Sequence, residues 1–205
     1  MHFHWSPEPV ILNPLPTAVF AAVMLCWLVF AGAFLLRRKP SVTGERKGDP
    51  ASKLGIWLQG VGYALVWMLQ RRMFTPPLPL GIPFEILLGA VTIGLAAGSV
   101  WITLAAIRTL GRQWSFQARL VEGHQLVTDG PYGLVRHPIY TGMFGMLVAT
   151  GLALSHWVAL LPAVLVFSLG MAVRVRSEER LLREAFGADF EEYARRVPAV
   201  LPRLL

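Results

Sequence analysis

The chain has 205 residues, of which 55% are apolar and 15% charged, and its formal net charge at pH 7 is +7. Its mean hydropathy is positive. This composition is typical of an integral membrane protein and argues against a soluble domain. The sequence carries no nucleic-acid-binding signature, and the basic excess is explained by membrane topology.

The N-terminal stretch "MHFHWSPEPVILNP" has no lysine or arginine before the first apolar run, Leu15 to Leu36. A secretory signal begins with a basic segment, so we expect this run to be a retained membrane span. His2 and His4 have no third ligand beside them, and we predict no metal site. Cys26 is the single cysteine, which excludes an intrachain disulfide, and we expect it to be a packing residue.

Four more apolar runs approach the length of about 20 residues that a helix needs to cross the hydrocarbon core. They cover Leu54 to Gln70, Ile86 to Ile107, Ile139 to Leu154 and Trp157 to Val173. The last two form a helical hairpin, because only Ser155 and His156 separate them. The sequence therefore predicts an all-α, polytopic integral membrane protein with about five transmembrane helices and a cytoplasmic C-terminal helical segment.

All lysines and arginines except Arg71 and Arg72 fall in three segments, 37–53, 108–138 and 174–205. With five spans, these segments lie on one side of the membrane. The positive-inside rule places that side in the cytoplasm, with the N-terminus outside and the C-terminus cytoplasmic. The loop 37–53 is expected to be a solvated basic linker that could lie against anionic lipid headgroups, and the proline-rich loop 71–85 a stiff connection.

We expect two regions: residues 1–107, a membrane region of three spans, and residues 108–205, which carry the chemistry. In the latter, "GPYGLVRHPIY" places Pro138 as the first helical residue after a cap at His137. Arg136, His137 and Tyr140 could be interfacial anchors, or could form an anion site at the helix start. Glycines 142 and 145 admit either a ligand or a neighbouring helix close to the backbone.

The helix of the last span should continue without a break to Gly187. Helical spacing then places Arg174 with Glu178, and Glu179 with Arg183, either as exposed salt bridges or as part of a site. A final short helix is predicted from a cap at Asp189, with one face packed back onto the membrane surface through Phe190 and Tyr193. Together the two segments offer a cationic, amide-rich end and an anionic end, which suits a zwitterionic amino-acid ligand.

The runs "LGRQWS", "EGHQLVTDGPYGLVRHPIYTG" and "RVRSEERLLREAFGADFEEYARRVPAVLP" resemble the isoprenylcysteine carboxyl methyltransferase family and its relatives among membrane phospholipid and thiol methyltransferases. The resemblance covers about the last hundred residues. It rests on Arg-His-Pro-x-Tyr-x-Gly, a Glu-Glu pair, Phe-Gly-x-x-(Phe/Tyr)-x-x-Tyr and Val-Pro, which occur in order.

The resemblance implies that S-adenosylmethionine binds between the loop before the fourth span and the helix after the fifth. Its cofactor residues would be Tyr132, Arg136, His137, Tyr140, Gly142, Glu178 and Glu179. Arg174, one turn before Glu178, falls where the family places an arginine near the methyl acceptor, so we expect catalytic roles for Arg174 and Glu178. We expect Glu178 and His137 to lie near the water interface, outside the apolar bundle.

The expected partners are membrane lipids and a lipophilic acceptor that enters sideways from the bilayer. The acceptor atom could belong to the carboxylate of an isoprenylcysteine-like molecule, or to a thiol or an amine. A carboxylate needs no general base, and the sequence shows no dedicated base near Arg174, which favours a carboxylate or another group that ionises readily.

Two other classes stay open at this stage. Membrane sterol and enone reductases resemble this family in the C-terminal half and use NADPH, whose phosphates could bind Arg174, Arg176 and Arg180. A non-catalytic membrane scaffold would bind only lipid headgroups. The Glu-Glu pair suits an ammonium group better than a phosphate and argues against both.

Overall fold

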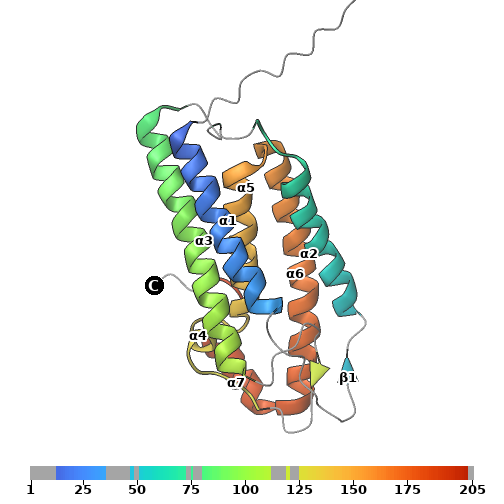
Figure 1. The fold of residues 1–205 in the computed structure, drawn as a ribbon. Coiled ribbons are helices and arrows are strands. Elements are labelled where there is room, and N and C mark those ends of the chain that lie inside the picture. The colour runs from blue at the N-terminus through green and yellow to red at the C-terminus, as the bar shows by residue number, and fades with distance from the viewer. Residues whose placement is uncertain are drawn as a thin grey trace, which may run out of the picture.

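The computed structural model describes residues 13–35, 47–48, 51–72, 75, 80–111, 119–120 and 125–202. Five long helices form a bundle (Figure 1). Their bounds are α1 Pro14–Leu35, α2 Ala51–Met68, α3 Ile82–Leu110, α5 Pro138–Leu154 and α6 Trp157–Phe186. Each of the five predicted runs is therefore a helix, and α6 continues past its apolar part as predicted.

Proline and glycine set the helix ends as the sequence indicated. Proline opens α5 after the N-cap residue His137, and it removes no needed donor there. Gly187 ends α6 with φ near +50°, in the left-handed region that glycine adopts without steric cost. His156 begins α6 and accepts a hydrogen bond from the amide of Val158, so the α5–α6 connection is the tight turn that was predicted.

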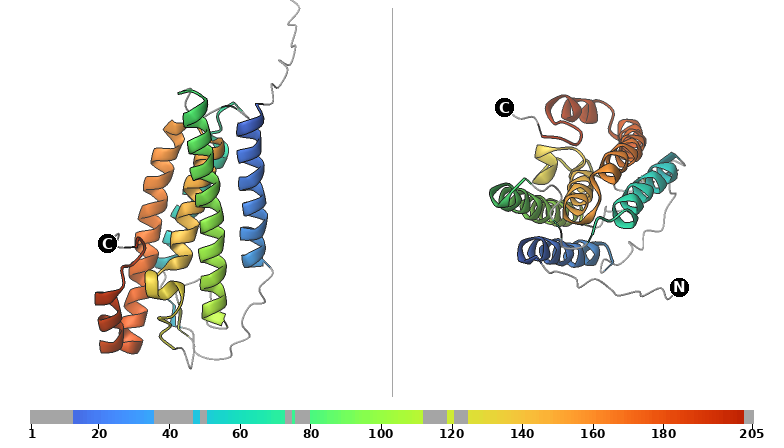
Figure 2. Two further views of the ribbon diagram at one scale, coloured as in Figure 1. Left: turned by 90° about the vertical axis from the view of Figure 1, so that its left-hand side faces the viewer. Right: turned by 90° about the horizontal axis from the view of Figure 1, so that it is seen from above.

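The five helices alternate in direction, and α5 lies in the middle of the bundle, with α1, α2, α3 and α6 around it (Figures 1 and 2). The closest pairs are α2 with α6 and α3 with α5. Both pairs use glycine. A Cβ added to Gly142 would lie 2.0 Å from Thr103 Oγ1, and one added to Gly145 would lie 2.3 Å from Ser99 Oγ. Of the two uses left open for these glycines, the structure therefore shows helix packing.

The outer faces of the helices expose large apolar side chains, such as Leu28, Trp101 and Leu165. By length and composition α1, α3 and α6 could each cross a membrane, and α5 is a shorter apolar helix of 17 residues. Apolar surface on this scale is stable only in lipid, and the chain is an integral membrane protein. The count of five spans is consistent with this bundle and stays a prediction.

At one end of the bundle, Arg71 ties the α2–α3 loop to the α5–α6 turn. Its guanidinium donates to the carbonyl oxygens of Leu152, Ala153 and Ser155 at 3.1, 2.6 and 3.0 Å. These are orphan carbonyls at the end of α5, which a cation satisfies well. Arg71 thus holds the residues that follow α2 against the end of α5. Residues 73–74 and 76–79 of the predicted stiff connection lie outside the described residues.

The opposite end carries the shorter elements, and we call it the α7 end. There α4 (Pro131–Leu134) and α7 (Ala188–Arg196) lie beside the start of α5 and the end of α6 (Figure 1). Strand β1 (Lys47–Gly48) pairs antiparallel with β2 (Arg119–Leu120), a contact between two loops that was not predicted. The predicted cap of the last helix is wrong: Gly187 is its N-cap, because the turn that ends α6 also starts α7, and Asp189 lies inside the first turn.

Candidate functional site

The predicted cofactor residues gather at the α7 end, where the start of α5 meets the last turns of α6. The backbone between α4 and α5 is held by the chain after α7. The amides of Arg136 and His137 each donate at 2.9 Å, to the carbonyls of Pro198 and Ala199. Thr141 Oγ1 donates to Val200 O at 2.7 Å. Residues 198–200, here named the C-terminal strap, therefore fix the position of His137.

His137 lies between the two glutamates. Its Nδ1 is 3.3 Å from Glu178 Oε2, and its Nε2 is 3.3 Å from Glu179 Oε1. The residue is only 6% exposed. One ring thus joins the start of α5 to the carboxylates of Glu178 and Glu179 on α6, and it can do so because the two ring nitrogens point in different directions.

Arg136 forms a buried ion pair with Glu179. Its Nε and Nη2 donate to Glu179 Oε1 at 3.0 and 2.6 Å. The same guanidinium donates to the carbonyls of Ala194, at 3.0 Å, and Val197, at the end of α7. Arg183 adds a contact of 3.2 Å to Glu179 Oε2, so the predicted pair one turn apart on α6 is confirmed. Arg136 and Glu179 together hold α7 against the bundle.

Tyr140 connects Glu178 to Arg174. Its hydroxyl donates to Glu178 Oε1, and its ring stacks beside His137 with the planes 19° apart. The guanidinium of Arg174 also lies over the Tyr140 ring, 4.6 Å from the ring centroid, as in a cation–π contact. Arg174 also donates from Nη1 to Gln59 Oε1 at 2.9 Å. The polar network therefore runs from α2 through α6 to α5.

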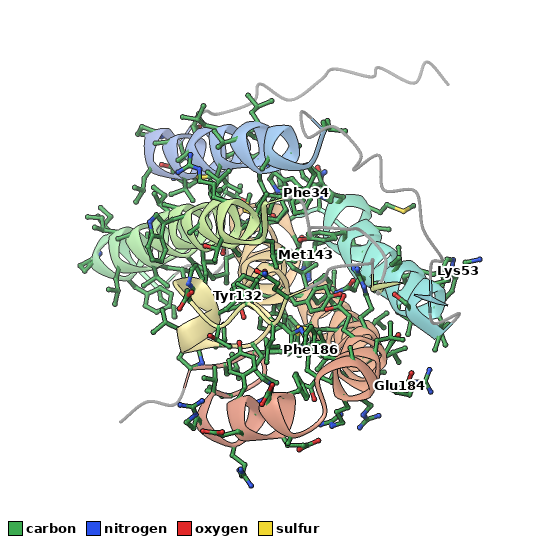
Figure 3. The ribbon with its side chains drawn as sticks, turned by 90° about the horizontal axis from the view of Figure 1, so that it is seen from below. Phe34, Lys53, Tyr132, Met143, Glu184 and Phe186 are labelled. Carbon is green, nitrogen blue, oxygen red and sulfur yellow. The ribbon has the colours of Figure 1, made fainter. Side chains whose placement is uncertain are left out.

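Tyr132 completes the wall of the site from α4. It is buried, and its carbonyl accepts a hydrogen bond of 2.7 Å from the hydroxyl of Tyr193 on α7. Seen from the α7 end, Tyr132 lies on the inner side of its helix, whereas Lys53 and Glu184 lie at the outer edge (Figure 3). Phe190 and Tyr193 are both buried within the protein. Their predicted packing onto the membrane surface stays a prediction.

The pKa shifts show that the cluster favours charged groups. Burial alone would lower the pKa of His137, but the hydrogen bonds and charges of Glu178 and Glu179 outweigh it and raise that pKa. Burial opposes ionisation of the carboxylates, yet the hydrogen bond and charge of His137 lower the pKa of Glu178. His137 and Arg136 together lower the pKa of Glu179 to about 2. An imidazolium between two carboxylates is the favoured state.

Two features of these placements were not predicted from the sequence. His137, Arg174 and Glu179 lie at the α7 end but are only 6, 5 and 7% exposed, so other parts of the protein cover them. The expected position of His137 and Glu178 near the water interface stays a prediction. The burial has a simple cause: α7 and the C-terminal strap cover this end of the bundle. Gly142 is separate from the cluster, because its backbone faces Ser99 and Thr103 of α3.

The arginines proposed for NADPH phosphates do not gather. Arg174 is buried toward α2 and α5, whereas Arg176 and Arg180 are exposed. At 100° per residue, positions 176 and 180 lie on the side of the helix roughly opposite to position 174. A phosphate cluster on these three side chains is therefore not formed.

Sequence reasoning missed Gln59 and the C-terminal strap. Gln59 is a polar residue within an apolar span, "GIWLQGVGY", and such a residue is a functional-site signal by default. That signal was present. The strap acts through backbone carbonyls, for which the sequence has no signature beyond the prolines that end the helix.

The residues present fit the amino-acid part of S-adenosylmethionine. Glu178 is the more open carboxylate, with 26% of its side chain exposed against 9% for Glu179. It can accept an ammonium group, while Glu179 is occupied by two arginines. The start of α5 has no side-chain cap, so its first-turn amides can bind a carboxylate.

Comparison with known proteins places the same part of the chain in a family. Residues 86–189 match the family described as phospholipid methyltransferase. The nickel-cobalt-cadmium resistance protein NccN of Alcaligenes xylosoxydans xylosoxydans is 39% identical over 114 residues, which are 54% of this chain and 50% of that protein. Protein-S-isoprenylcysteine O-methyltransferase B of Arabidopsis thaliana is 36% identical over 99 residues, 47% of this chain and 50% of that protein.

The fission yeast Schizosaccharomyces pombe has a protein-S-isoprenylcysteine O-methyltransferase that is 39% identical over 79 residues, 38% of this chain and 34% of that protein. The matched stretches thus span half or less of these relatives. The family match itself covers half of the chain and includes α3 from residue 86 on, α5, α6 and the His137, Glu178 and Glu179 cluster. The chain therefore belongs to the phospholipid methyltransferase family.

Proposed function

We propose that this protein is a membrane methyltransferase that uses S-adenosylmethionine and methylates a lipophilic acceptor arriving from the bilayer. The observation that carries the proposal is the cluster of His137, Tyr140 and Glu178, which presents an open carboxylate beside uncapped helix amides. The names of the plant and yeast relatives support the same chemistry.

The roles of the chain's own groups follow from their positions. Glu178 would hold the ammonium group of the amino acid, and the first-turn amides of α5 would hold its carboxylate. When bound, the cofactor supplies a methyl group that a sulfonium centre has already activated. The protein then has only to align the acceptor with that methyl, and alignment alone can supply most of the rate.

Arg136 and Glu179 would support the site without contacting the cofactor. Their ion pair and the bonds of Arg136 to the end of α7 hold the strap, and the strap in turn holds the amide of His137. The site is thus built on two helices and closed by a third. Tyr132 and Tyr193 would exclude water from it, because both are buried.

Arg174 is the residue that we propose for the acceptor. It is buried at the end of the apolar part of α6, where a group attached to a lipid would reach it from the bilayer. A guanidinium attracts a carboxylate and repels an ammonium group. A carboxylate acceptor of isoprenylcysteine type therefore fits better than an amine, and it requires no base.

We further propose that the α7 end is cytoplasmic and the N-terminus outside, as the positive-inside rule indicates. The check uses a Cys26→Ser background with a cysteine at either His156, exposed at the α5–α6 turn, or Glu192, exposed on α7. An impermeant maleimide should label intact cells only at position 156. Labelling only at position 192 would reverse the orientation.

The activity is tested with membranes that contain the protein, radiolabelled S-adenosylmethionine and an S-farnesylcysteine whose amino group is acetylated. We expect methyl transfer to the carboxylate by the wild type. Glu178→Gln should lose about 90 to 99% of it, because one charged contact contributes roughly 1.5 to 3 kcal/mol. Glu192→Gln, the same change at an exposed site, should keep full activity. Equal rates in both variants would overturn the assignment of Glu178.

A further inference from the structure

Gln59 lies in the membrane region outside the family match, and it deepens the proposed function by extending the acceptor site. It is 2% exposed and sits on the buried stripe of α2 that also contains Ser52 and Gly55. About 12 Å of helix separates it from the start of α2, so it lies below the surface of the α7 end. Burying an amide at this depth costs free energy unless its donors and acceptor form hydrogen bonds.

The helices come together closely at this level. A Cβ on Gly55 would lie 2.4 Å from the Cγ of Arg174, and one on Gly170 would lie 2.7 Å from the carbonyl oxygen of Gly55. Arg174 therefore crosses the backbone of α2 to reach Gln59. The two glycines allow this crossing, which no larger residue would permit.

The contact with Arg174 fixes which way the amide of Gln59 points. A guanidinium has only donors, so the atom that faces Arg174 Nη1 at 2.9 Å is the oxygen Oε1. The Nε2 group is then directed elsewhere. It is buried and has no hydrogen-bond partner in the described part of the chain.

Two hydroxyls on the same two helices, α2 and α6, share this property. Ser52 lies two turns before Gln59 on the same stripe, and Ser177 lies one turn after Arg174; both hydroxyls are buried without a partner among the described residues. Elsewhere in the bundle Ser99, Thr92 and Thr150 donate to the carbonyl four residues earlier. Of the three buried side-chain hydroxyls without a partner in the described part of the chain, two lie on α2 and α6, and the third, that of Thr103, lies on α3.

We propose that Gln59 is a second hydrogen-bond donor for the methyl acceptor, and that its Nε2 and the guanidinium of Arg174 together select an acceptor ending in a carboxylate. The inference rests on the proposed function. Both groups are donors, so they favour an anion that accepts hydrogen bonds. In the step itself a carboxylate oxygen bonds to the methyl carbon, the carbon–sulfur bond breaks and its electron pair stays on sulfur, and no proton moves.

The test measures binding of two probes to the full chain in detergent: N-acetyl-S-farnesylcysteine and its methyl ester. The probes differ only in the carboxylate. The wild type should bind the acid at least about tenfold more tightly than the ester, the factor expected for one lost charged hydrogen bond. Equal affinities in the wild type would overturn the inference.

Two variants distinguish the two proposed roles of Gln59, which are to accept a hydrogen bond from Arg174 and to donate one to the methyl acceptor. Gln59→Glu keeps an oxygen for Arg174 but loses the donor, whereas Gln59→Leu loses both. Both should reduce the preference for the acid to within about threefold and raise the KM for the acid more than they lower kcat. Gln70→Leu, at an exposed glutamine just beyond the other end of α2, should retain the preference. A retained preference in Gln59→Glu would reject donation.

The same samples are titrated with S-adenosylhomocysteine. Its affinity should stay within about twofold in all variants, because Gln59 is proposed to touch only the acceptor. Absence of that binding in the wild type, with a preference for the acid that depends on Gln59, would reject the methyltransferase proposal and leave the acceptor site standing. Failure of the methyltransferase proposal can therefore be distinguished from failure of the inference about Gln59.

Discussion

His137 is the residue on which the site depends, because among the described residues it is the one whose side chain contacts both Glu178 and Glu179. Its position is set from the backbone side by the C-terminal strap and from the ring side by Glu178 and Glu179. Such a residue cannot be an interfacial anchor, the simpler interpretation of the sequence, since an anchor reaches lipid or water. Its burial instead makes it the link between Glu178, the proposed cofactor contact, and the ion pair of Arg136 with Glu179 that supports the site.

The charges of His137 and Glu179 predict how stability depends on pH. The folded pKa of His137 is raised, so its contribution is complete below its unfolded value of about 6.5 and is lost as pH rises through the folded pKa. The folded pKa of Glu179 is about 2. Its contribution is complete above the unfolded value of about 4.3 and is lost as pH falls toward 2.

The site should therefore stabilise the fold most between about pH 4.5 and 6.5. The measurement is the thermal unfolding midpoint in detergent across this range, for the wild type and for His137→Gln. In the wild type, titration of the His137 ring should lower the unfolding midpoint as the pH rises above about 6.5. The variant should lack this part of the decline. Parallel profiles for the two proteins would contradict a charged His137.

Arg136 is predicted to be a structural residue of the site. Arg136→Ala leaves Glu179 without its main partner and frees the end of α7, so we expect a loss of about 3 to 5 kcal/mol in stability. Arg196→Ala, at an arginine 70% exposed that pairs with Glu192, should cost less than about 1 kcal/mol. Chemical unfolding in detergent measures both. Similar small losses would show that the buried pair contributes little.

Among the elements, α5 has the most constrained environment, because it lies in the centre of the bundle and packs on four neighbours. Its faces differ in use. The first turn serves the site through His137 and Tyr140, and the next face serves α3 through Gly142 and Gly145. A substitution in the first turn should therefore reduce ligand binding. A substitution on the face that packs on α3 should reduce the stability of the fold.

Gly142→Ala tests the second face. The added Cβ would overlap Thr103 Oγ1 and lie 2.8 Å from the carbonyl of Ser99, which is backbone and cannot turn away. We expect a loss of about 1 to 3 kcal/mol. Gly98→Ala on α3 meets nothing within 4 Å and should be neutral or slightly stabilising. A destabilisation by Gly98→Ala equal to that of Gly142→Ala would refute the packing role.

The element ends could be predicted because local chemistry sets them: Pro138 and Gly187 act within one turn of chain. Helix pairing could not, since an apolar run does not state which neighbour it meets. For that reason the contact between Gln59 and Arg174 could not be predicted, although a polar residue within a membrane span is visible in the sequence. The cap at Asp189 failed because Gly187 serves two helices at once.

On the scale of the whole molecule, the two ends of the bundle have different roles. Arg71 closes one end by binding the last carbonyls of α5, while the other end gathers the charged groups into one network. That network links α2 to α7 through Gln59, Arg174, Tyr140, Glu178, His137, Glu179 and Arg136. The N-terminal half, which no motif covered, thereby contributes to the site.

The central claim is that this network binds S-adenosylmethionine, and calorimetric titration of the purified protein in detergent tests it most directly. S-adenosylhomocysteine should bind saturably, with NADPH showing no binding in a parallel titration. Glu178→Ala and His137→Ala should abolish the binding in protein that is still folded by circular dichroism. Binding of NADPH alone, or unchanged affinity for S-adenosylhomocysteine in both variants, would contradict the account.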